Sequence, residues 1–422
     1  MTSMNQGPRP KLGPDGKPKK RMPPHSVGPI NLLVLQPTPF CNLDCAYCYL
    51  PSRTNKAKMP METAEKAIIR TMESGLVSKK LSIVWHAGEP LVMPRDWYRE
   101  ADALVQKHCA GVEVTHNFQS NAVLVNDDWC DLFKSMKTRM GVSIDGPEHI
   151  HDAHRKTRAG KGTHKSVMKG VECLNRNDVP FHIISVVTKE FLHDYEAALD
   201  FFESLTGAGL TSVGFNVEEF EGNHEDTSMD NDTGTRHLFR EFLRDCHKRH
   251  AAGRLNIREV REYDKFIKQG GVRPRLMKTQ QNAPFRIITV GHDGGFSTFS
   301  PELHDMAMAD GEKFVFGNVH ENAILDAFAN PMFVRYMSDI IDGYSACSKS
   351  CAFFDVCAGG SPGNKFFELG TMAGTETLFC DYRVKETVTI LRDAMGLDPI
   401  VDDHPALIPA TPAVMAELAK IQ

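Results

Sequence analysis

The sequence lacks the features of three broad classes of protein. It contains no apolar run of 18 residues, so we expect no membrane-spanning helix. Its N-terminus has no apolar signal region, which argues against secretion by that route. With 49 basic and 54 acidic residues, the formal net charge is only -5, and no excess of positive charge directs the chain to nucleic acid. We therefore expect a cytoplasmic globular protein that binds neither membranes nor nucleic acid.

Cysteine, by contrast, is plentiful, with 11 residues in 422. In a secreted chain this number would suit disulfides, whereas clustered cysteines in a cytoplasmic chain more often bind metal or take part in redox chemistry. Seven of the cysteines fall into two clusters. The four others lie singly on expected helices and are predicted to be packed and inert: Cys109, Cys130, Cys173 and Cys246.

Strand-like and helix-like segments alternate through the first 60% of the chain. Residues 31–36 form an apolar run that is too short for a helix, and residues 61–76 have helical spacing. Further strands are expected at 81–86, 112–119, 140–144, 180–187 and 211–217, and further helices at 95–109, 127–137, 163–177, 192–205 and 235–251. Six strand–helix units predict an α/β fold with a parallel sheet. Periodicity alone leaves an open sheet and a partial barrel as alternatives.

The alternation ends near residue 253. Residues 287–300 contain an Asp-Gly-Gly turn that is typical of a β-hairpin, and a glycine-rich segment with cysteines follows. These features predict a second, smaller domain at 253–383, after a first domain at 30–252. Prolines alternating with basic residues predict a disordered tail over 1–29, and residues 384–422 are expected to form a helical extension.

The first cysteine cluster follows the first expected strand directly. Cys41, Cys45 and Cys48 lie within eight residues and can converge on one inorganic site. Three buried apolar cysteines or a partial zinc site are alternatives, but zinc usually takes a fourth ligand and none is nearby. Three ligands on a four-iron cluster would leave one iron open to bind a small molecule.

This cluster resembles the signature of the radical S-adenosylmethionine (radical SAM) superfamily. The spacing C-x3-C-x-aromatic-C, with Tyr47 as the aromatic residue, carries the resemblance. The resemblance implies a partial (β/α)6 TIM-like barrel and a 4Fe–4S cluster whose open iron chelates SAM. It also implies reductive cleavage of SAM to a 5′-deoxyadenosyl radical that abstracts a hydrogen from the substrate.

Loops after the next expected strands resemble the SAM-binding loops of that superfamily. Ala87-Gly88-Glu89-Pro90 is similar to its Gly-Gly-Glu-Pro segment, with Ala87 in place of the first glycine. Physically, Gly88 allows a backbone to approach a ligand and Glu89 accepts an ammonium group. An arginine such as Arg155 can bind a carboxylate with two parallel hydrogen bonds. By resemblance, the cofactor-binding residues are Tyr47, Gly88, Glu89, Gln119, Asn121, Ser143, Asp145 and Arg155.

The second cysteine cluster can close a tetrahedral site. Its members, separated by three, five and 22 residues, are Cys347, Cys351, Cys357 and Cys380. Ligation by cysteine alone suits zinc and an iron–sulfur cluster equally. In a chain that also contains the first cluster, however, this region resembles the SPASM extension of radical SAM enzymes that modify peptides and proteins.

One ligand set of that extension is missing from this chain. The SPASM extension normally holds two auxiliary 4Fe–4S clusters, but this sequence has Ser300, Asn322 and Ser361 where the pattern places cysteines of one set. The resemblance therefore implies two 4Fe–4S clusters in total, one that binds SAM and one auxiliary, in a smaller C-terminal SPASM-like iron–sulfur domain.

The resemblance covers roughly residues 30–383 and implies a radical SAM oxidoreductase. Within it, the segment Val84–Pro90 is most similar to maturases of ribosomally synthesised peptides, including glycine-rich precursors. We expect an oxidative carbon–carbon or carbon–heteroatom cross-link in such a peptide. Formylglycine formation as in anaerobic sulfatase maturation, thioether formation and epimerisation are alternatives, and a zinc-binding scaffold is an alternative from another class.

The expected partners follow from this chemistry. They are the precursor peptide and an electron donor such as flavodoxin or ferredoxin. About 40 residues before Cys41 are too few for a winged-helix recognition domain, so the barrel, the second domain or a separate peptide-recognition protein are the alternatives for recognising the precursor. No residue could be assigned as the general base.

Overall fold

The computed structural model describes residues 27–222, 224, 226–229, 232–268, 280–308 and 311–400. Its centre is a nine-stranded sheet in the order β6-β5-β4-β3-β2-β1-β7-β8-β9. The first six strands pair in parallel with their sequence neighbours, which confirms the predicted parallel sheet. They are β1 (Ile30–Leu35), β2 (Val77–Trp85), β3 (Glu113–Ser120), β4 (Arg139–Ser143), β5 (Phe181–Val187) and β6 (Leu210–Val217).

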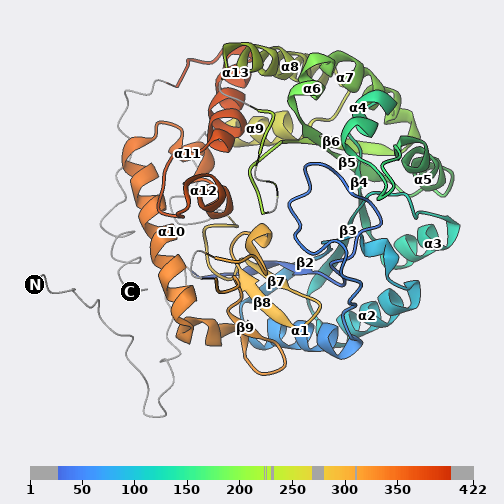
Figure 1. Cartoon of the computed structure of the whole chain (residues 1–422), viewed down its shortest axis with the longest axis vertical. Coiled ribbons are helices and arrows are strands. Elements are labelled where there is room, and N and C mark those ends of the chain that lie inside the picture. The colour runs from blue at the N-terminus through green and yellow to red at the C-terminus, as the bar shows by residue number, and fades with distance from the viewer. Residues whose placement is uncertain are drawn as a thin grey trace, which may run out of the picture.

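Helices surround this sheet on its outer side, and loops fill the space on its inner side (Figure 1). The sheet curves as a partial barrel, so the open-sheet alternative is wrong. The helices of the barrel are α1 (Met61–Glu73), α2 (Arg95–His108), α3 (Asp127–Ser135), α4 (Glu148–His154), α5 (His164–Arg176), α6 (Lys189–His193), α7 (Tyr195–Ser204), α8 (Thr233–Ala251) and α9 (Arg258–Lys268).

Local chemistry explains where several helices begin and end. The side chain of Asn126 accepts a hydrogen bond from the backbone N–H of Trp129 at 3.1 Å and caps α3. The predicted helix 192–205 is divided into α6 and α7 because Asp194 leaves the helical conformation, with φ -138°. Helix α4 was read from sequence as a loop, since its seven residues are too few to show a helical period.

An aromatic core joins the sheet to α2 and α3. Trp85 and Phe118 project from the outer face of neighbouring strands and are at most 1% exposed. Tyr98 contacts both rings edge-on, at centroid distances of 5.3 and 4.9 Å. Burying side chains of this size stabilises the fold by about 1.5–3 kcal/mol each, so the sheet has a firm outer face and can keep polar groups on its inner face.

The C-terminal hairpin continues the barrel sheet. Strand β7 (Ile287–Val290) pairs in parallel with β1, and β8 (Gly295–Thr298) and β9 (Gly317–Asn318) follow antiparallel. The hairpin predicted over 287–300 is thus confirmed, but its first strand is hydrogen-bonded to the first domain. The domain division between residues 252 and 253 remains a prediction.

The region of the second cysteine cluster is mainly helical, where the sequence indicated an irregular glycine-rich segment. Asn330 caps the 20-residue α10 by accepting from the backbone N–H of Met332 at 2.9 Å, with Pro331 at its first position. The helices here are α10 (Pro331–Ser350), α11 (Phe354–Cys357), α12 (Pro362–Leu369), a π-helical turn (Cys380–Glu386) and α13 (Thr387–Ala394). The expected final helix, beyond residue 400, and most of the N-terminal tail lie outside the described residues.

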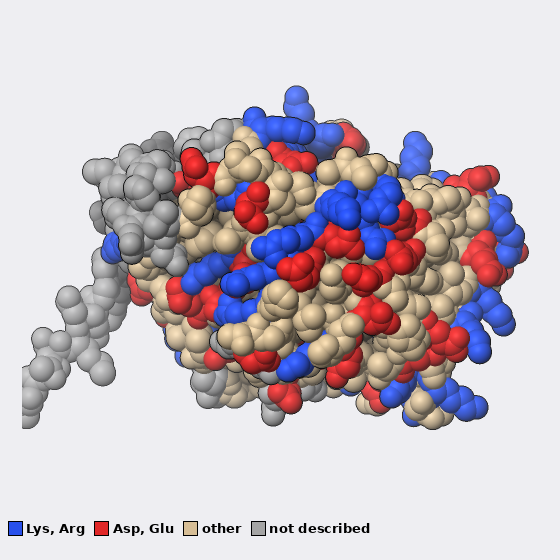
Figure 2. All heavy atoms as spheres, turned by 90° about the horizontal axis from the view of Figure 1, so that it is seen from above, with Lys and Arg blue, Asp and Glu red and all other residues tan. Residues whose placement is uncertain are grey.

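The surface agrees with the balanced composition. Acidic and basic side chains are interspersed over the face shown in Figure 2. Within the described ranges, no helix has both the length and the apolar character needed to cross a membrane.

Candidate active site

The loop with the first three cysteines is held against the segment after α4. The backbone N–H groups of Asp44 and Ala46 donate to the carbonyls of Lys156 and His154 at 2.8 and 3.0 Å. The guanidinium of Arg158 donates to the carbonyl of Cys41 at 2.8 Å. These bonds join residues more than 100 positions apart and place the loop over the ends of the barrel strands.

The thiols of Cys41 and Cys45 share a partly buried, electrostatically coupled environment. Burial raises the pKa of Cys41 to about 12, and the charges of Glu89, Cys45 and Cys48 add to the rise. Burial also raises the pKa of Cys45 to about 11, against the charge of Arg155. Such thiols ionise only when a positive metal centre compensates the thiolate charge, which is the donor set that an iron–sulfur cluster requires.

Gly88 and Glu89 connect the cysteine loop to the ends of β2 and β3. Gly88 has φ +55°, and a Cβ on it would come within 2.3 Å of the carbonyl oxygen of Phe40. The close approach that requires a glycine is therefore to the cysteine loop, whereas the sequence had suggested an approach to a ligand. Glu89, 1% exposed, accepts hydrogen bonds from Leu91 N–H, Ser120 Oγ and Asn121 N–H at 3.0, 2.7 and 2.8 Å.

Glu89 lacks a cationic partner. Burial raises its pKa to about 7, and its three hydrogen bonds only partly oppose this. Within the part of the chain that the structure describes, no ion pair engages it. A buried carboxylate without a counter-charge is well suited to an ammonium group of a ligand, as expected for the amino group of SAM.

The other expected SAM contacts line the inner face of the barrel. Gln119, at the end of β3, donates to Ser143 Oγ at the end of β4, at 2.8 Å. Asn121 donates to Asn42 Oδ1 at 2.8 Å and lies 3.9 Å from the sulfur of Cys41. The structure thus brings these strand-end residues together with the cysteine loop.

Asp145, Arg155 and Tyr47 form one buried network. The guanidinium of Arg155 donates from Nε to Asp145 Oδ2 at 2.9 Å and from Nη2 to Oδ1 at 3.1 Å. The Tyr47 hydroxyl donates to Asp145 Oδ2, and its ring lies 5.3 Å from the Arg155 guanidinium carbon. Burial raises the pKa of Asp145, but the charge and hydrogen bonds of Arg155 outweigh this and hold it below 3.8. Arg155 therefore orients Asp145. A ligand carboxylate would bind the N–H groups of Arg155 that Asp145 leaves free.

Three carboxyl groups that sequence reasoning missed lie near Tyr49, which follows the cysteine loop. Burial raises the pKa of Glu219, Glu221 and Glu302, and the charge of Glu302 adds to the rise of both Glu219 and Glu221. All three raise the pKa of Tyr49, which follows Cys48 directly, although burial is the larger cause. Carboxyl groups whose pKa is raised by burial can exchange protons with a substrate.

A cavity of about 270 Å³ adjoins Glu302. Its lining includes Tyr49, Ala87, His292 and Glu302. It therefore lies between the cysteine loop, the Gly88 loop and the C-terminal hairpin. The sequence signal for the missed residues was the position of Glu218-Glu219-Phe220-Glu221 after the sixth strand, at the same end of the barrel as the other loops.

The four cysteines of the second cluster line a single cavity. Cys347 lies in the last turn of α10, Cys357 ends α11 and Cys380 begins the π-helical turn, and with Cys351 they line one small cavity. π-Helical turns occur frequently at functional sites. Among the described residues, no group of three or more His, Cys, Asp or Glu side chains is spaced for a single metal ion.

The missing ligand set of the C-terminal region has been replaced by ordinary packing. Ser300 and Ser361 stand where the family pattern has cysteines, and their hydroxyl oxygens lie 3.3 Å apart. Phe299 is fully buried and stacks on Phe333 at 5.8 Å. A hydrogen-bonded pair and an aromatic core fill this place.

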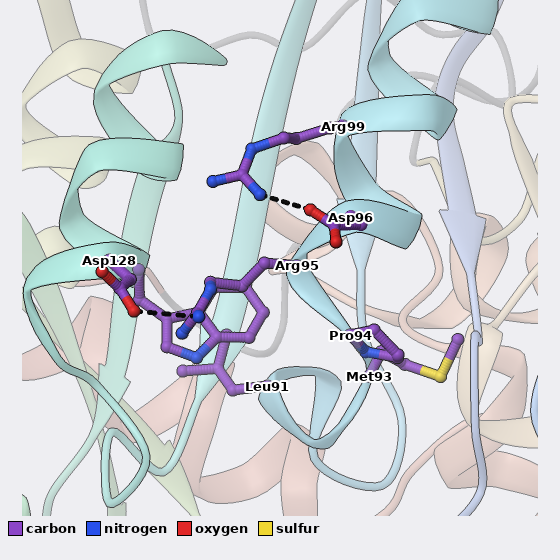
Figure 3. A pocket seen from close by; sticks show the side chains of 8 residues that line it. Leu91, Met93, Pro94, Arg95, Asp96, Arg99 and Asp128 are labelled. Carbon is purple, nitrogen blue, oxygen red and sulfur yellow. Dashed lines mark hydrogen bonds and ion pairs between the residues drawn. The ribbon is translucent and has the colours of Figure 1, made fainter.

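A separate depression of about 810 Å³ opens between the starts of α2 and α3 (Figure 3). Its charged side chains pair with each other, Arg95 with Asp128 at 2.8 Å and Arg99 with Asp96 at 2.5 Å. It contains no cysteine and no expected SAM contact. The depression is therefore distinct from the candidate active site.

Comparison with known proteins identifies the family. Residues 35–202 match the Radical SAM superfamily. A Synechocystis protein of uncharacterized function is 37% identical over 381 residues, which cover 88% of this chain and 94% of the relative. The chain is a radical SAM enzyme. The cofactors of that superfamily, a 4Fe–4S cluster and SAM, are those expected from the first cysteine cluster.

Maturases are among the relatives of this radical SAM enzyme. A serine-type anaerobic sulfatase-maturating enzyme of Bacteroides thetaiotaomicron is 34% identical over 180 residues, 41% of this chain and 42% of the relative. The chain thus matches under half the length of that maturase.

Two solved structures share the fold of the radical SAM enzyme. The structure of anSMEcpe with bound AdoMet has a TM-score of 0.69 at 19% identity and covers 87% of this chain and all of its own. Streptococcus suis SuiB, bound to its precursor peptide SuiA, has a TM-score of 0.59 at 14% identity, covering 84% of this chain and 76% of its own. These likenesses confirm the partial-barrel fold.

Proposed function

We propose that this radical SAM enzyme modifies a ribosomally synthesised peptide by forming an oxidative cross-link between two of its residues. The observation that carries the proposal is the pair of thiol sets, three in the loop above the barrel and four around one cavity. Similarity to maturases supports a peptide substrate, since one solved neighbour is bound to a precursor peptide and another to the Cp18Cys peptide.

The geometry supports the following assignment of the residues. Cys41, Cys45 and Cys48 hold a 4Fe–4S cluster with one open iron, and Glu89 accepts the amino group of SAM. When bound, these cofactors supply a 5′-deoxyadenosyl radical that takes a hydrogen atom from the peptide, and an auxiliary cluster at Cys347, Cys351, Cys357 and Cys380 supplies an acceptor for a second electron.

The carboxyl groups near Tyr49 would accept the proton that the proposed reaction releases. A cross-link removes two hydrogens from the peptide, one as an atom and one as a proton plus an electron. Glu302 borders the cavity next to the cysteine loop, and with Glu219 and Glu221 it forms the group that accepts the proton. A carboxylate whose pKa is raised toward neutrality is a stronger base than an ordinary one.

Formylglycine formation is the second candidate, favoured by the sulfatase-maturating relative. Conversion of serine to formylglycine also removes two hydrogens, but it leaves an aldehyde that reacts with a hydrazide probe. The two functions are therefore distinguished by reaction of the product with that probe.

The test uses anaerobically reconstituted enzyme with SAM, dithionite and either a glycine-rich precursor peptide or a serine-containing sulfatase peptide. We expect 5′-deoxyadenosine and a precursor peptide that has lost two hydrogens and does not react with hydrazide. A hydrazide-reactive sulfatase peptide instead would establish the second candidate. Replacement of Cys41, Cys45 and Cys48 by alanine should abolish 5′-deoxyadenosine formation, and undiminished formation would refute the assignment of the SAM-binding cluster.

A further inference from the structure

Lys365 is a buried cation beside the second set of thiols. The residue is 3% exposed, lies on α12 and lines the same cavity as the four cysteines. Its ammonium nitrogen lies 3.5 Å from the sulfur of Cys347. Among the described residues, no carboxylate forms an ion pair with it. A buried ammonium without a carboxylate is costly unless an anion compensates its charge.

The helix opposite Lys365 is shaped to admit the ammonium group. Gly343 precedes Cys347 by four residues, so both lie on the same face of α10, one turn apart. A Cβ on Gly343 would lie 2.4 Å from the backbone oxygen of Met372 and 3.0 Å from the Lys365 ammonium nitrogen. The absence of a side chain here thus accommodates both that carbonyl and the charge beside the thiol.

We propose that Lys365 is the counter-charge of the metal–thiolate group at Cys347, Cys351, Cys357 and Cys380 and raises its reduction potential. This inference rests on the proposed assignment of those cysteines as the ligands of an auxiliary cluster. Four thiolates make the site anionic, and one-electron reduction adds a further negative charge. A buried ammonium at hydrogen-bond distance from a ligand sulfur stabilises the more negative, reduced form, since hydrogen bonds to ligand sulfurs and net charge set such potentials.

The consequence concerns the proposed oxidation. A site that accepts an electron from the peptide needs a potential high enough to be reduced by it. Lys365 is thus a positioning and tuning residue that touches the ligand sulfur and not the substrate.

A second lysine provides a matched control. Lys385 lies near the Cys351 and Cys380 thiols, but its ammonium pairs with Glu376 at 2.7 Å and with Asp381 at 3.3 Å. Its charge is already compensated, and its side chain is 20% exposed. Removing it should therefore affect the potential much less.

The experiment uses full-length protein in which Cys41, Cys45 and Cys48 are alanine, so that only the second site binds a cluster. Reconstituted parent protein, Lys365→Met, Lys365→Gln, Lys365→Arg and Lys385→Met are titrated with dithionite, and reduction is followed by electron paramagnetic resonance. We expect Lys365→Met and Lys365→Gln to lower the equilibrium constant for one-electron reduction about tenfold, ~59 mV to the negative side. Lys365→Arg, which keeps the charge, and Lys385→Met should stay close to the parent.

Two results would overturn the proposal in distinguishable ways. Equal midpoint potentials in the parent and both neutral variants, at equal iron content, would refute the role of Lys365 alone. A parent protein that binds zinc or no iron would refute the ligand assignment and with it the proposal. The glutamine variant keeps a hydrogen-bond donor but no charge, so a fall shared with the methionine variant assigns the effect to charge rather than to hydrogen bonding.

Discussion

Replacing Arg155 by methionine should destabilise the apoprotein strongly, because it leaves a buried carboxylate without its cation. The side chains of Arg155 and Asp145 are 8% and 2% exposed and are joined by two hydrogen bonds. Breaking a buried pair by removing one partner costs about 3–5 kcal/mol. Asp145 keeps the hydroxyl of Tyr47 and the N–H of Val186 as donors, so we expect the lower end, about 3 kcal/mol.

The assay is the free energy of unfolding in urea, followed by circular dichroism at neutral pH. The pKa of Asp145 is held below 3.8 in the folded state, so the contribution of the pair is present above that pH and is lost as the pH falls through the depressed pKa. In Arg155→Met burial is left to raise the pKa of Asp145 above its ordinary value, so the variant takes up a proton as the pH falls and its deficit should be largest at neutral pH and shrink steadily in acid.

A matched control is the exposed pair of Arg176 and Asp127, whose side chains are 59% and 64% exposed. Arg176→Met should cost only about 0–1 kcal/mol. The double variant Arg155→Met/Asp145→Asn should lose less unfolding free energy than the two single variants lose together, because it contains no unpaired buried charge. A loss below about 1 kcal/mol for Arg155→Met would refute the reasoning that this pair is a buried, mutually dependent unit.

Two further predictions concern the Gly88-Glu89 loop. The pKa of Glu89 is raised from 4.5 to about 7, so its contribution to stability is complete below pH 4.5 and is lost as the pH rises through 7. Between pH 5 and 8, the unfolding free energy of the apoprotein should therefore fall by about 3 kcal/mol more than that of the Glu89→Gln variant. Equal pH dependence of the two unfolding free energies would contradict this. Gly88→Ala places a Cβ 2.3 Å from the Phe40 carbonyl oxygen, so it should displace the cysteine loop and lower the iron content from about eight to about four atoms per chain. The control Gly75→Ala has a similar φ of +67° but open space around it, and it should keep about eight. Equal iron contents in the two variants would show that the cysteine loop tolerates the side chain.

The strand–helix alternation could be predicted because its signals are local. Six short apolar runs and the helical spacing between them depend on the periods of strand and helix, which the sequence displays directly. The helix α10 was missed although it has 20 residues, because Gly343 and the cysteine-rich end interrupted its pattern. The short α4 was missed because seven residues hold too few turns to reveal a period.

The composition of the candidate site could also be predicted from local features of the sequence. The spacing of Cys41, Cys45 and Cys48, and the position of each polar loop after a strand, are sequence facts, and a parallel barrel places such loops at one end. The sequence alone therefore indicated the cofactor chemistry and the residues that gather around it.

Only the tertiary structure decided which of these residues contact one another. The pairing of Arg155 with Asp145 depends on how the short helix α4, which separates the two residues, folds back on the end of β4, and the approach of Lys365 to Cys347 depends on how α12 packs on α10. Glu219 and Glu302 lie 83 positions apart and meet only because β7 joins the sheet beside β1. These contacts arise from sheet order and helix packing, which are properties of the whole chain, and so no local pattern in the sequence reports them.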